Sequence, residues 1–318
     1  MRVVFLGTPD FALPSLRALV NSRFEVCAVV TQPDRPAGRG LNTQPPPVKI
    51  FAQESRIPVY QPAKIRSEEN RPLFESFRCD FLVAVAYGQI LPRWLLDLPR
   101  LAPVNVHASL LPKYRGASPA ARALLNGETL TGVTTMLMEE TLDTGPVLLQ
   151  KEVPVELAMT CGQLESLLAE VGADLLVPTL EGLNSGSLRP RPQDHSRATL
   201  APKVTKEMAV LRWDQTALKI HNQIRALNPW PLARTEFKGQ TVQLFQSLPA
   251  SVVESQTHGP GTLVGLTQGG LLVQCGENTV LEVLQLQVAG RKRVTGRQFA
   301  SGARASPGES LFPITTSE

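Results

Sequence analysis

Short apolar runs alternate with helix-like segments over the first two thirds of the chain. The apolar runs predict β-strands at Arg2–Gly7, Glu25–Gln32, Ile57–Tyr60, Asp80–Tyr87, Ala102–Ala108, Thr131–Met138 and Pro146–Val155. The segments with helical periodicity predict helices at Phe11–Val20, Val48–Arg56, Ser118–Leu125 and Cys161–Leu183. Such alternation is typical of an α/β domain in which helices pack against a mostly parallel sheet.

The pattern changes after residue 187. Residues 188–205 contain prolines and basic residues without periodicity, which predicts a surface linker. Beyond them, Ala217–Leu227 has helical periodicity and short strand-like runs recur between glycines. That spacing is typical of a small β-barrel of the OB-like kind. We therefore expect a Rossmann-like α/β domain at 1–187, the linker at 188–205, the barrel at 206–310 and a loosely held tail at 311–318.

Composition narrows the class of protein. Hydrophobic residues make up 42% of the chain and charged residues 19%, as in soluble globular proteins. No apolar run reaches the length of a membrane span, and the first residues enter a strand without a leader-like segment. We expect a cytoplasmic protein that does not bind membranes. The four cysteines lie far apart, without metal-ligand spacing, so we expect reduced thiols and no metal site.

Charge is concentrated near the C-terminal end of the predicted barrel. The formal net charge is +4, which permits a polyanionic partner without requiring one. Residues 283–304 contain five basic residues and no acidic one: Arg291, Lys292, Arg293, Arg297 and Arg304. A solvated surface patch is the simplest interpretation. A small barrel with a basic stripe is also a common nucleic-acid-binding arrangement.

Asn105 and His107 are the first candidates for chemistry. Because alternate side chains of a strand share a face, these two point one way, while Val104 and Val106 point the other. The pair stands at the carboxyl end of a predicted parallel strand, where open α/β sheets place their ligand sites. A structural histidine is the alternative, but the neighbouring amide and the position favour a functional site.

Asp143 is the second candidate, in the turn that follows the strand Thr131–Met138. An Asx-type turn would account for it as well. That strand and the one bearing His107 are expected to be neighbours, however, so the carboxylate can approach the imidazole. A carboxylate beside a histidine orients the ring and favours its charged form, as a proton-transfer site requires.

Two loops complete the candidate site. The turn GTPDF, Gly7–Phe11, follows the first strand but lacks the G-x-G-x-x-G of a dinucleotide-binding enzyme. A nucleotide-dependent oxidoreductase is therefore disfavoured. The loop Thr31–Lys49 is rich in proline, glycine and basic residues and longer than an ordinary connection, as binding loops often are. Arg35 and Arg39 in it can meet phosphates.

These residues resemble a known family. The motif from Asn105 to Pro112, with Gly116 and the Asp143 of LDTG, is similar to the formyltransferases that use 10-formyltetrahydrofolate. GTPDF, TQPDRPAGRG, VAYGQILP and NPWP resemble the members of that family that act on aminoacylated tRNA. The resemblance extends from Met1 to about Arg297, and Ala108 replaces a glycine common among relatives. The resemblance does not include the last dozen residues.

The resemblance implies transfer of a formyl group from N10 of the folate to the α-amino group of methionyl initiator tRNA, for translation initiation. Residues 1–187 would be the catalytic domain and 206–310 the tRNA-binding one. It implies that Asn105 and protonated His107 donate hydrogen bonds to the negative oxygen of the tetrahedral intermediate. Asp143 would orient and charge His107 and relay the proton, directly or through water. No metal is implied, and we expect a monomer.

The resemblance also assigns the binding residues. Those expected to hold the folate are Tyr87, Gly88, Gln89, Ile90, Leu91, Pro92, Ser109, Leu110, Leu111 and Pro112. Pro9 and Phe11 are expected to enclose the methionyl side chain. Arg35 and Arg39, with Arg39 foremost, and the cluster Arg291, Lys292 and Arg293 are expected to contact the tRNA.

Formyltransferases that act on other acceptors would be expected to differ from this sequence. A glycinamide ribonucleotide formyltransferase would end near residue 200, without the barrel. An amino-sugar formyltransferase would not be expected to keep PDRPAGRG, and a folate-dependent hydrolase is usually part of a longer chain. A non-catalytic RNA-binding protein on an α/β scaffold would not need Asn105, His107 and Asp143 together.

Overall fold

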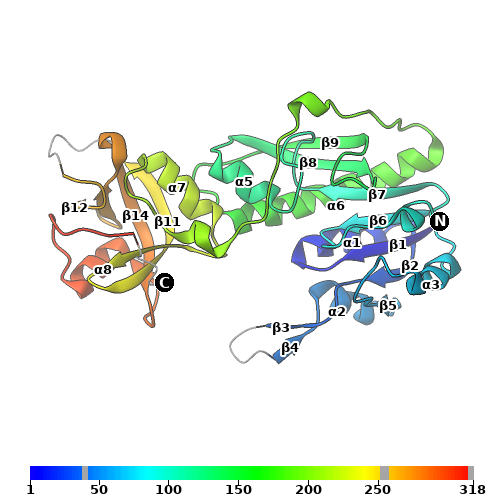
Figure 1. The fold of residues 1–318 in the computed structure, drawn as a ribbon, viewed down its shortest axis with the longest axis horizontal. Helices are drawn as coiled ribbons and strands as arrows, with labels where there is room; N and C mark the ends of the chain where they lie inside the picture. Colours follow the sequence, from blue (N-terminus) through cyan, green and yellow to red (C-terminus); the bar gives the residue numbers. More distant parts are fainter. Residues whose placement is uncertain (38–41, 251–257, 314–318) are drawn as a thin grey trace. The chain divides into compact units, whose positions relative to one another are not determined.

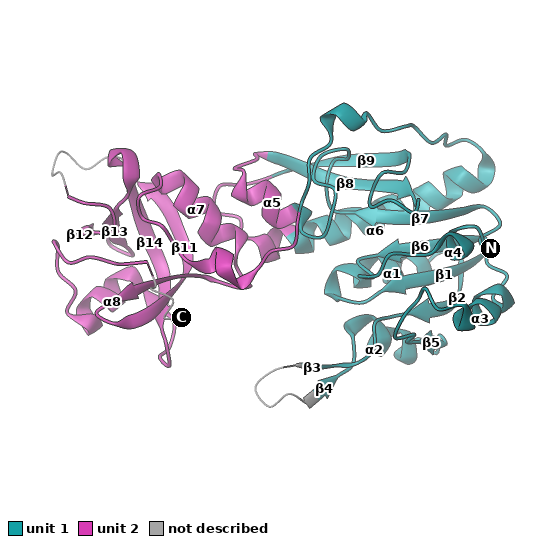
Figure 2. Cartoon of the chain, viewed as in Figure 1, with its two compact units in different colours: residues 1–119, 130–154, 165–201 teal, residues 120–129, 155–164, 202–318 magenta. Residues whose placement is uncertain are grey.

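The computed structural model describes residues 1–37, 42–250 and 258–313. The chain forms two compact units, coloured teal and magenta in Figure 2. The first contains Met1–Pro119, Leu130–Pro154 and Glu165–Ala201. The second contains Ala120–Thr129, Val155–Leu164 and Pro202–Glu318, so it includes two segments from the earlier part of the chain. This division into units does not test the domain boundaries that we drew from the sequence, which remain a prediction.

The first unit is built on a seven-stranded sheet with the strand order β5-β2-β1-β6-β7-β8-β9 (Figure 1). Its strands are β1 (Arg2–Gly7), β2 (Glu25–Val30), β5 (Val59–Tyr60), β6 (Phe81–Val85), β7 (Ala102–His107), β8 (Leu130–Leu137) and β9 (Val147–Pro154). The strands from β5 to β7 pair in parallel, whereas β8 and β9 pair antiparallel. This arrangement confirms the predicted mostly parallel α/β sheet.

Helices lie between these strands along the chain or follow the last of them. They are η1 (Asp10–Ala12), α1 (Leu13–Val20), α2 (Pro47–Glu54), η2 (Glu68–Asn70), α3 (Arg71–Ser76), α4 (Arg93–Leu96), α5 (Pro119–Leu125), α6 (Cys161–Ser185) and η3 (His195–Arg197). The sequence predicted α1, α2, α5 and α6 but missed α3 and α4, which are too short to show helical periodicity. The Pro-rich loop contains the two-stranded pair β3 (Arg35–Ala37) and β4 (Asn42–Gln44), also not predicted.

The two faces of β7 have different neighbours. Val106 faces α6, where a Cβ on Gly172 would lie 2.8 Å from Val106 Cγ1, so the glycine lets the helix approach closely. On the opposite face, Ala84 belongs to a core cluster with Phe74 of α3 and Leu95 of α4. Asn105 is in register with Ala84 and therefore lies on this face. His107 shares it.

The second unit is an antiparallel sheet with the strand order β10-β11-β14-β13-β12. Its strands are β10 (Ala233–Phe237), β11 (Gln240–Ala250), β12 (Leu263–Leu266), β13 (Leu271–Gln274), β14 (Val280–Val288) and β15 (Val294–Thr295), which pairs with β14. Its helices after residue 202 are η4 (Lys206–Ala209), α7 (Ala217–Ala226), η5 (Gly276–Asn278) and α8 (Gly296–Ala303). Ile220 of α7 and Phe299 of α8 are buried in one core with the strands.

The last described residues differ from the loose tail expected there. The amide of Leu311 donates to the carbonyl of Gly261 beside β12, at 2.8 Å. Phe312 exchanges two backbone hydrogen bonds with Glu236 of β10, at 2.8 and 2.9 Å. The segment thus joins the two edge strands and closes the sheet into a barrel, which leaves Leu311 only 3% exposed. Long-range pairing of this kind leaves no local signal in the sequence.

None of the helices in the described parts of the chain is both long enough and apolar enough to cross a membrane.

Candidate active site

Asn105 and His107 lie on one face of β7, as the alternation predicted. Asn105 is in register with Met136 of β8, and His107 with Thr134. The Asn105 side chain is half-buried, and its amide makes no hydrogen bond with the residues that the structure describes. Its two N–H groups can therefore donate to a ligand on this face.

The ring of His107 is 6% exposed and faces protein at both nitrogens. Nε2 donates to the carbonyl oxygen of Tyr114 at 2.9 Å, because a carbonyl oxygen can only accept. This contact assigns the Nε2 proton. Nδ1 lies 3.7 Å from Oδ2 of Asp143, which is too long for a hydrogen bond but close for an ion pair. A proton on Nδ1 makes the ring a cation beside a carboxylate.

The turn that carries Asp143 folds back along the sheet to reach His107. Since β8 runs antiparallel to β7, its end at Leu137 pairs with Val104 rather than with His107. Asp143 has a φ of 55°, in the left-handed region that Asp tolerates better than most residues. Its Oδ2 accepts from the amide of Gly116 at 2.8 Å, and its side chain is 10% exposed. Strand adjacency was predicted correctly, but not this reversal.

Gly116 joins the two loops of the site. Its φ is 127°, and a Cβ there would lie 2.7 Å from the carbonyl oxygen of Ala201. Both features require glycine. The amide that this backbone presents to Asp143 fixes one carboxylate oxygen beside the His107 ring.

The predicted folate residues divide into buried and exposed groups. Tyr87 and Leu91 are buried in the core cluster under α3 and α4, and burial raises the pKa of the Tyr87 hydroxyl. Gly88, with a φ of 88°, and Ile90, which is 50% exposed, present backbone to the surface. A flat heterocycle with several donors and acceptors fits such exposed backbone.

The neighbouring positions brace this loop. Gln89 accepts from the amide of Ile65 through Oε1 at 2.9 Å. Pro92 is the residue that precedes α4. Gln89 thus makes a contact within the protein, and Pro92 sits at the start of a helix. Of this stretch, Gly88 and Ile90 are therefore the positions with most freedom to touch one.

The loop after β7 is divided in the same way. Ser109 donates to the carbonyl of Lys113 at 2.6 Å, and Leu111 is buried beside Met136 and Val147. Leu110 and Pro112 are partly exposed. Ser109 and Leu111 therefore shape the loop, while the other two can contact a ligand.

The remaining first-unit candidates lie on loops. Pro9 is exposed and Phe11 partly exposed, directly after β1. Arg35 is exposed on β3 and donates to Oε1 of Gln32 at 3.1 Å. Arg39 lies outside the described residues. The base of this hairpin is held by Lys49, whose Nζ lies 2.8 Å from Oδ2 of Asp34.

The basic cluster of the second unit lies between β14 and β15. Arg291, Lys292 and Arg293 are all exposed. The guanidinium of Arg293 lies 3.6 Å from the centre of the Phe245 ring, a cation–π contact that leaves its N–H edges available.

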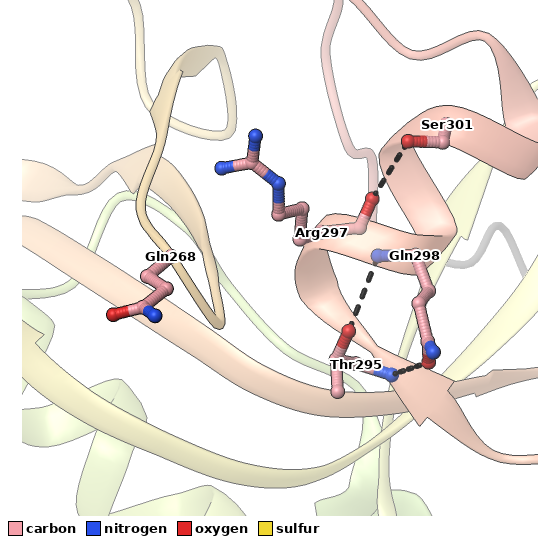
Figure 3. Close-up of a pocket in the computed structure, with 5 residues that line it drawn as sticks. All are labelled: Gln268, Thr295, Arg297, Gln298 and Ser301. Carbon is pink, nitrogen blue, oxygen red and sulfur yellow. Dashed lines mark hydrogen bonds between the residues drawn. The ribbon is translucent and has the colours of Figure 1, made fainter.

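A shallow polar pocket lies elsewhere in this unit, beside α8 (Figure 3). It is lined by Gln268, Thr295, Arg297, Gln298 and Ser301. Thr295 caps the helix by accepting from the amide of Gln298, and Arg297 donates to the carbonyl of Thr267 at 3.0 Å. The pocket's polar groups are thus largely satisfied within the protein.

Comparison with known proteins defines the class. Residues 1–180 match the family model of formyl transferases, and residues 203–304 match the model of the formyl transferase C-terminal domain. The protein called methionyl-tRNA formyltransferase in Acetivibrio thermocellus is 44% identical, over 98% of this chain and 99% of the relative. The protein of the same name in Solibacter usitatus is 47% identical, over 98% of each chain. This chain belongs to the methionyl-tRNA formyltransferase family, as the resemblance in its motifs predicted.

Solved structures agree on the fold. WlaRD, a sugar 3N-formyl transferase, superposes with a TM-score of 0.67 at 16% identity, over 92% of this chain and 99% of that one. The N-formyltransferase from Helicobacter canadensis superposes with a TM-score of 0.66 at 15% identity, over 89% and 98% of the two chains. At such identities the likeness speaks for the fold alone.

Sequence reasoning missed some residues around the candidate site. Tyr114 binds His107 through a backbone carbonyl, which any residue type offers. Thr134 donates to the carbonyl of Ser109 at 2.7 Å from within a predicted strand. Gln193 reaches the Asp143 loop from the segment predicted to be a linker, where nothing in the composition marks it.

Proposed function

We propose that this chain transfers the formyl group of 10-formyltetrahydrofolate to the α-amino group of methionyl initiator tRNA, giving N-formylmethionyl-tRNA for translation initiation. Family membership and the near-full-length similarity to proteins of that name support the proposal. The observation that carries it is the grouping of Asn105, His107 and Asp143, with His107 Nδ1 3.7 Å from Asp143 Oδ2.

The reaction exchanges one C–N bond for another. The α-amino nitrogen attacks the formyl carbon, and the carbonyl electron pair moves to oxygen. Collapse of this tetrahedral intermediate breaks the bond to N10 of the folate. The attacking amine loses a proton and N10 gains one. An α-amino group ionises near neutral pH, so modest help in removing its proton suffices.

Asn105 donates to the negative oxygen of the intermediate. Its amide has no partner among the described residues, so no protein contact has to be broken before it binds that oxygen. A preorganised donor of this kind contributes about 3–4 kcal/mol to transition-state stabilisation. His107 acts as the second donor after release of one of its present contacts.

Asp143 keeps the ring oriented, with Oδ2 3.7 Å from Nδ1. The carboxylate also accepts from Gly116, which holds Oδ2 toward the ring while the other oxygen stays available for a proton in transit. The pair thereby serves proton transfer from the amine toward N10, directly or through water.

Binding is divided between the two units. Gly88, Ile90 and their neighbours after β6 hold the folate, and Pro9 and Phe11 enclose the methionyl side chain. Arg35 and Arg39 guide the acceptor end of the tRNA. Arg291, Lys292 and Arg293 bind its backbone electrostatically. The protein acts as a cytoplasmic monomer and needs no metal.

A steady-state assay with initiator and elongator methionyl-tRNAs side by side tests the acceptor. The proposal expects 10-formyltetrahydrofolate to formylate the initiator species with a kcat/KM at least about tenfold higher. Equal rates would refute initiator selectivity. Formylation of a nucleotide-linked amino sugar but of neither tRNA would refute the proposed acceptor.

A further inference from the structure

The segment expected to be a linker is bonded to both loops of the candidate active site. Arg191 exchanges two backbone hydrogen bonds with Val147, each 2.8 Å long, just after the Asp143 turn. Arg115, beside Gly116, donates its amide to the carbonyl of Thr199 at 2.9 Å and accepts from the amide of Ala201 at 2.7 Å. Backbone hydrogen bonds near both ends therefore hold residues 191–201 against the two loops of the candidate site.

Within residues 191–201, Gln193 is the residue whose side chain reaches the Asp143 turn. Its side chain is buried, with 7% of the residue exposed. Nε2 donates to the carbonyl of Asp143 at 2.9 Å and to the carbonyl of Gly145 at 2.7 Å. Both N–H groups of the amide are thus used on one short turn, on either side of Thr144.

Arg115 fixes the orientation of that amide. Its Nε and Nη2 donate to Oε1 of Gln193 at 3.1 and 2.6 Å. A guanidinium has no acceptor, so the amide oxygen must face Arg115 and the amide nitrogen must face the two carbonyls. Arg115 is itself buried, and its Nη2 also donates to Nδ1 of His195 at 3.1 Å.

We propose that Gln193 is a positioning residue for formyl transfer, which holds the Asp143 carboxylate beside His107 through the backbone of the Asp143 turn, with Arg115 fixing its amide. This inference rests on the proposed function. Asp143 adopts a φ of 55°, a left-handed conformation that still costs free energy for a residue with a Cβ, so hydrogen bonds to its backbone help to hold it. Thr141 and Leu142 in the same turn are exposed and supply little packing.

Gln193→Glu is the sharpest variant. It keeps the length of the side chain and gives Arg115 a charged acceptor, so residue 193 stays bonded to Arg115. It replaces two N–H donors with an oxygen facing the carbonyls of Asp143 and Gly145. We expect kcat to fall by about 10- to 100-fold, as a misplaced catalytic group does, with the KM for methionyl-tRNA changed by less than about twofold.

Gln53→Glu is the matched control. Gln53 is exposed on α2, and its side chain makes no hydrogen bond with the described residues. The same change of charge there should leave kcat and KM within about twofold of the wild type. Gln193→Met, which is of similar length without polar atoms, replaces Gln193→Glu if the latter fails to fold.

Two further measurements separate positioning from general loss of structure. In an Asp143→Asn background, Gln193→Glu should lower kcat by less than about twofold, because the residue acts through Asp143. Hydrogen exchange of the amides of residues 141–145 and of Gly116 should be about tenfold faster in Gln193→Glu, with the core strands unchanged.

The outcomes distinguish this inference from the proposed function. If the wild type does not formylate methionyl-tRNA, the proposed function fails. The exchange measurement then still tests whether Gln193 stabilises the Asp143 turn. If the wild type is active and Gln193→Glu matches Gln53→Glu in kcat, the positioning role is refuted. Equal losses of kcat with and without Asp143→Asn, or unchanged exchange in the turn, would also overturn it.

Discussion

Nδ1 of His107 lies 3.7 Å from Oδ2 of Asp143, while Nε2 of the same ring is bonded to the carbonyl of Tyr114 at 2.9 Å. The ring is therefore oriented by a backbone group on one side and by a carboxylate on the other. In the neutral form set by the Tyr114 contact, the lone pair of Nδ1 faces the negative charge. A proton on Nδ1 would instead face the carboxylate, so the two groups are placed for proton transfer.

Asn105→Ala tests the oxyanion donor. The substitution removes the amide on the β7 face, so we expect kcat to fall by about 100- to 1000-fold while the KM values change little, since the contact forms only in the transition state. Thermal unfolding should be nearly unchanged, because the side chain makes no hydrogen bond within the described residues. A decrease confined to KM would assign Asn105 to substrate binding instead.

Neutralising Arg291, Lys292 and Arg293 together tests the electrostatic contact with tRNA. If each meets one phosphate, the slope of log affinity against log salt should become shallower by roughly 2–3. Folate affinity should stay the same. A slope equal to that of the wild type would show that the cluster is only a solvated patch.

Lys49→Met tests the base of the hairpin in the Pro-rich loop. Hydrogen bonds from Lys49, and then from Gln61, lower the pKa of Asp34 below its usual value. A carboxylate with a lowered pKa in the folded state adds stability above its unfolded pKa, and loses it as the pH falls through the folded pKa. The variant should therefore unfold at a lower temperature than the wild type at pH 7, and the two should converge in strong acid.

That comparison is made by thermal unfolding over a series of pH values. Glu54→Gln on the same helix, whose exposed side chain has no salt bridge among the described residues, is the control and should track the wild type throughout. A difference between wild type and Lys49→Met that stays constant down to strong acid would mean that Asp34 is not involved.

The closing segment of the barrel offers a matched pair of substitutions. Leu311 is 3% exposed, so Leu311→Ala should lower the free energy of unfolding by about 2–4 kcal/mol. Phe312 is 57% exposed, and Phe312→Ala should lower it by less than about 1 kcal/mol. Denaturant unfolding of the full chain measures both. Equal small effects would mean that the segment is not held against the barrel in solution.

The sequence predicted most of the first sheet because its strands are apolar and its helices long. It also put Asn105 and His107 on one face, since strand periodicity alone decides that. Asp143 required strand adjacency, and the fold back along antiparallel β8 was not visible. Gln193 was missed because it acts at long range from a segment without periodicity. Leu311 and Phe312 were missed for the same reason, since they pair with Gly261 and Glu236 far away in sequence.

A single-turnover assay with initiator methionyl-tRNA, 10-formyltetrahydrofolate and excess enzyme tests the central claim most directly. We predict rapid formation of formylmethionyl-tRNA by the wild type, and rates lower by about 100-fold or more in His107→Ala and in Asp143→Asn. Absence of product with the wild type, or an undiminished rate in either variant, would contradict the account.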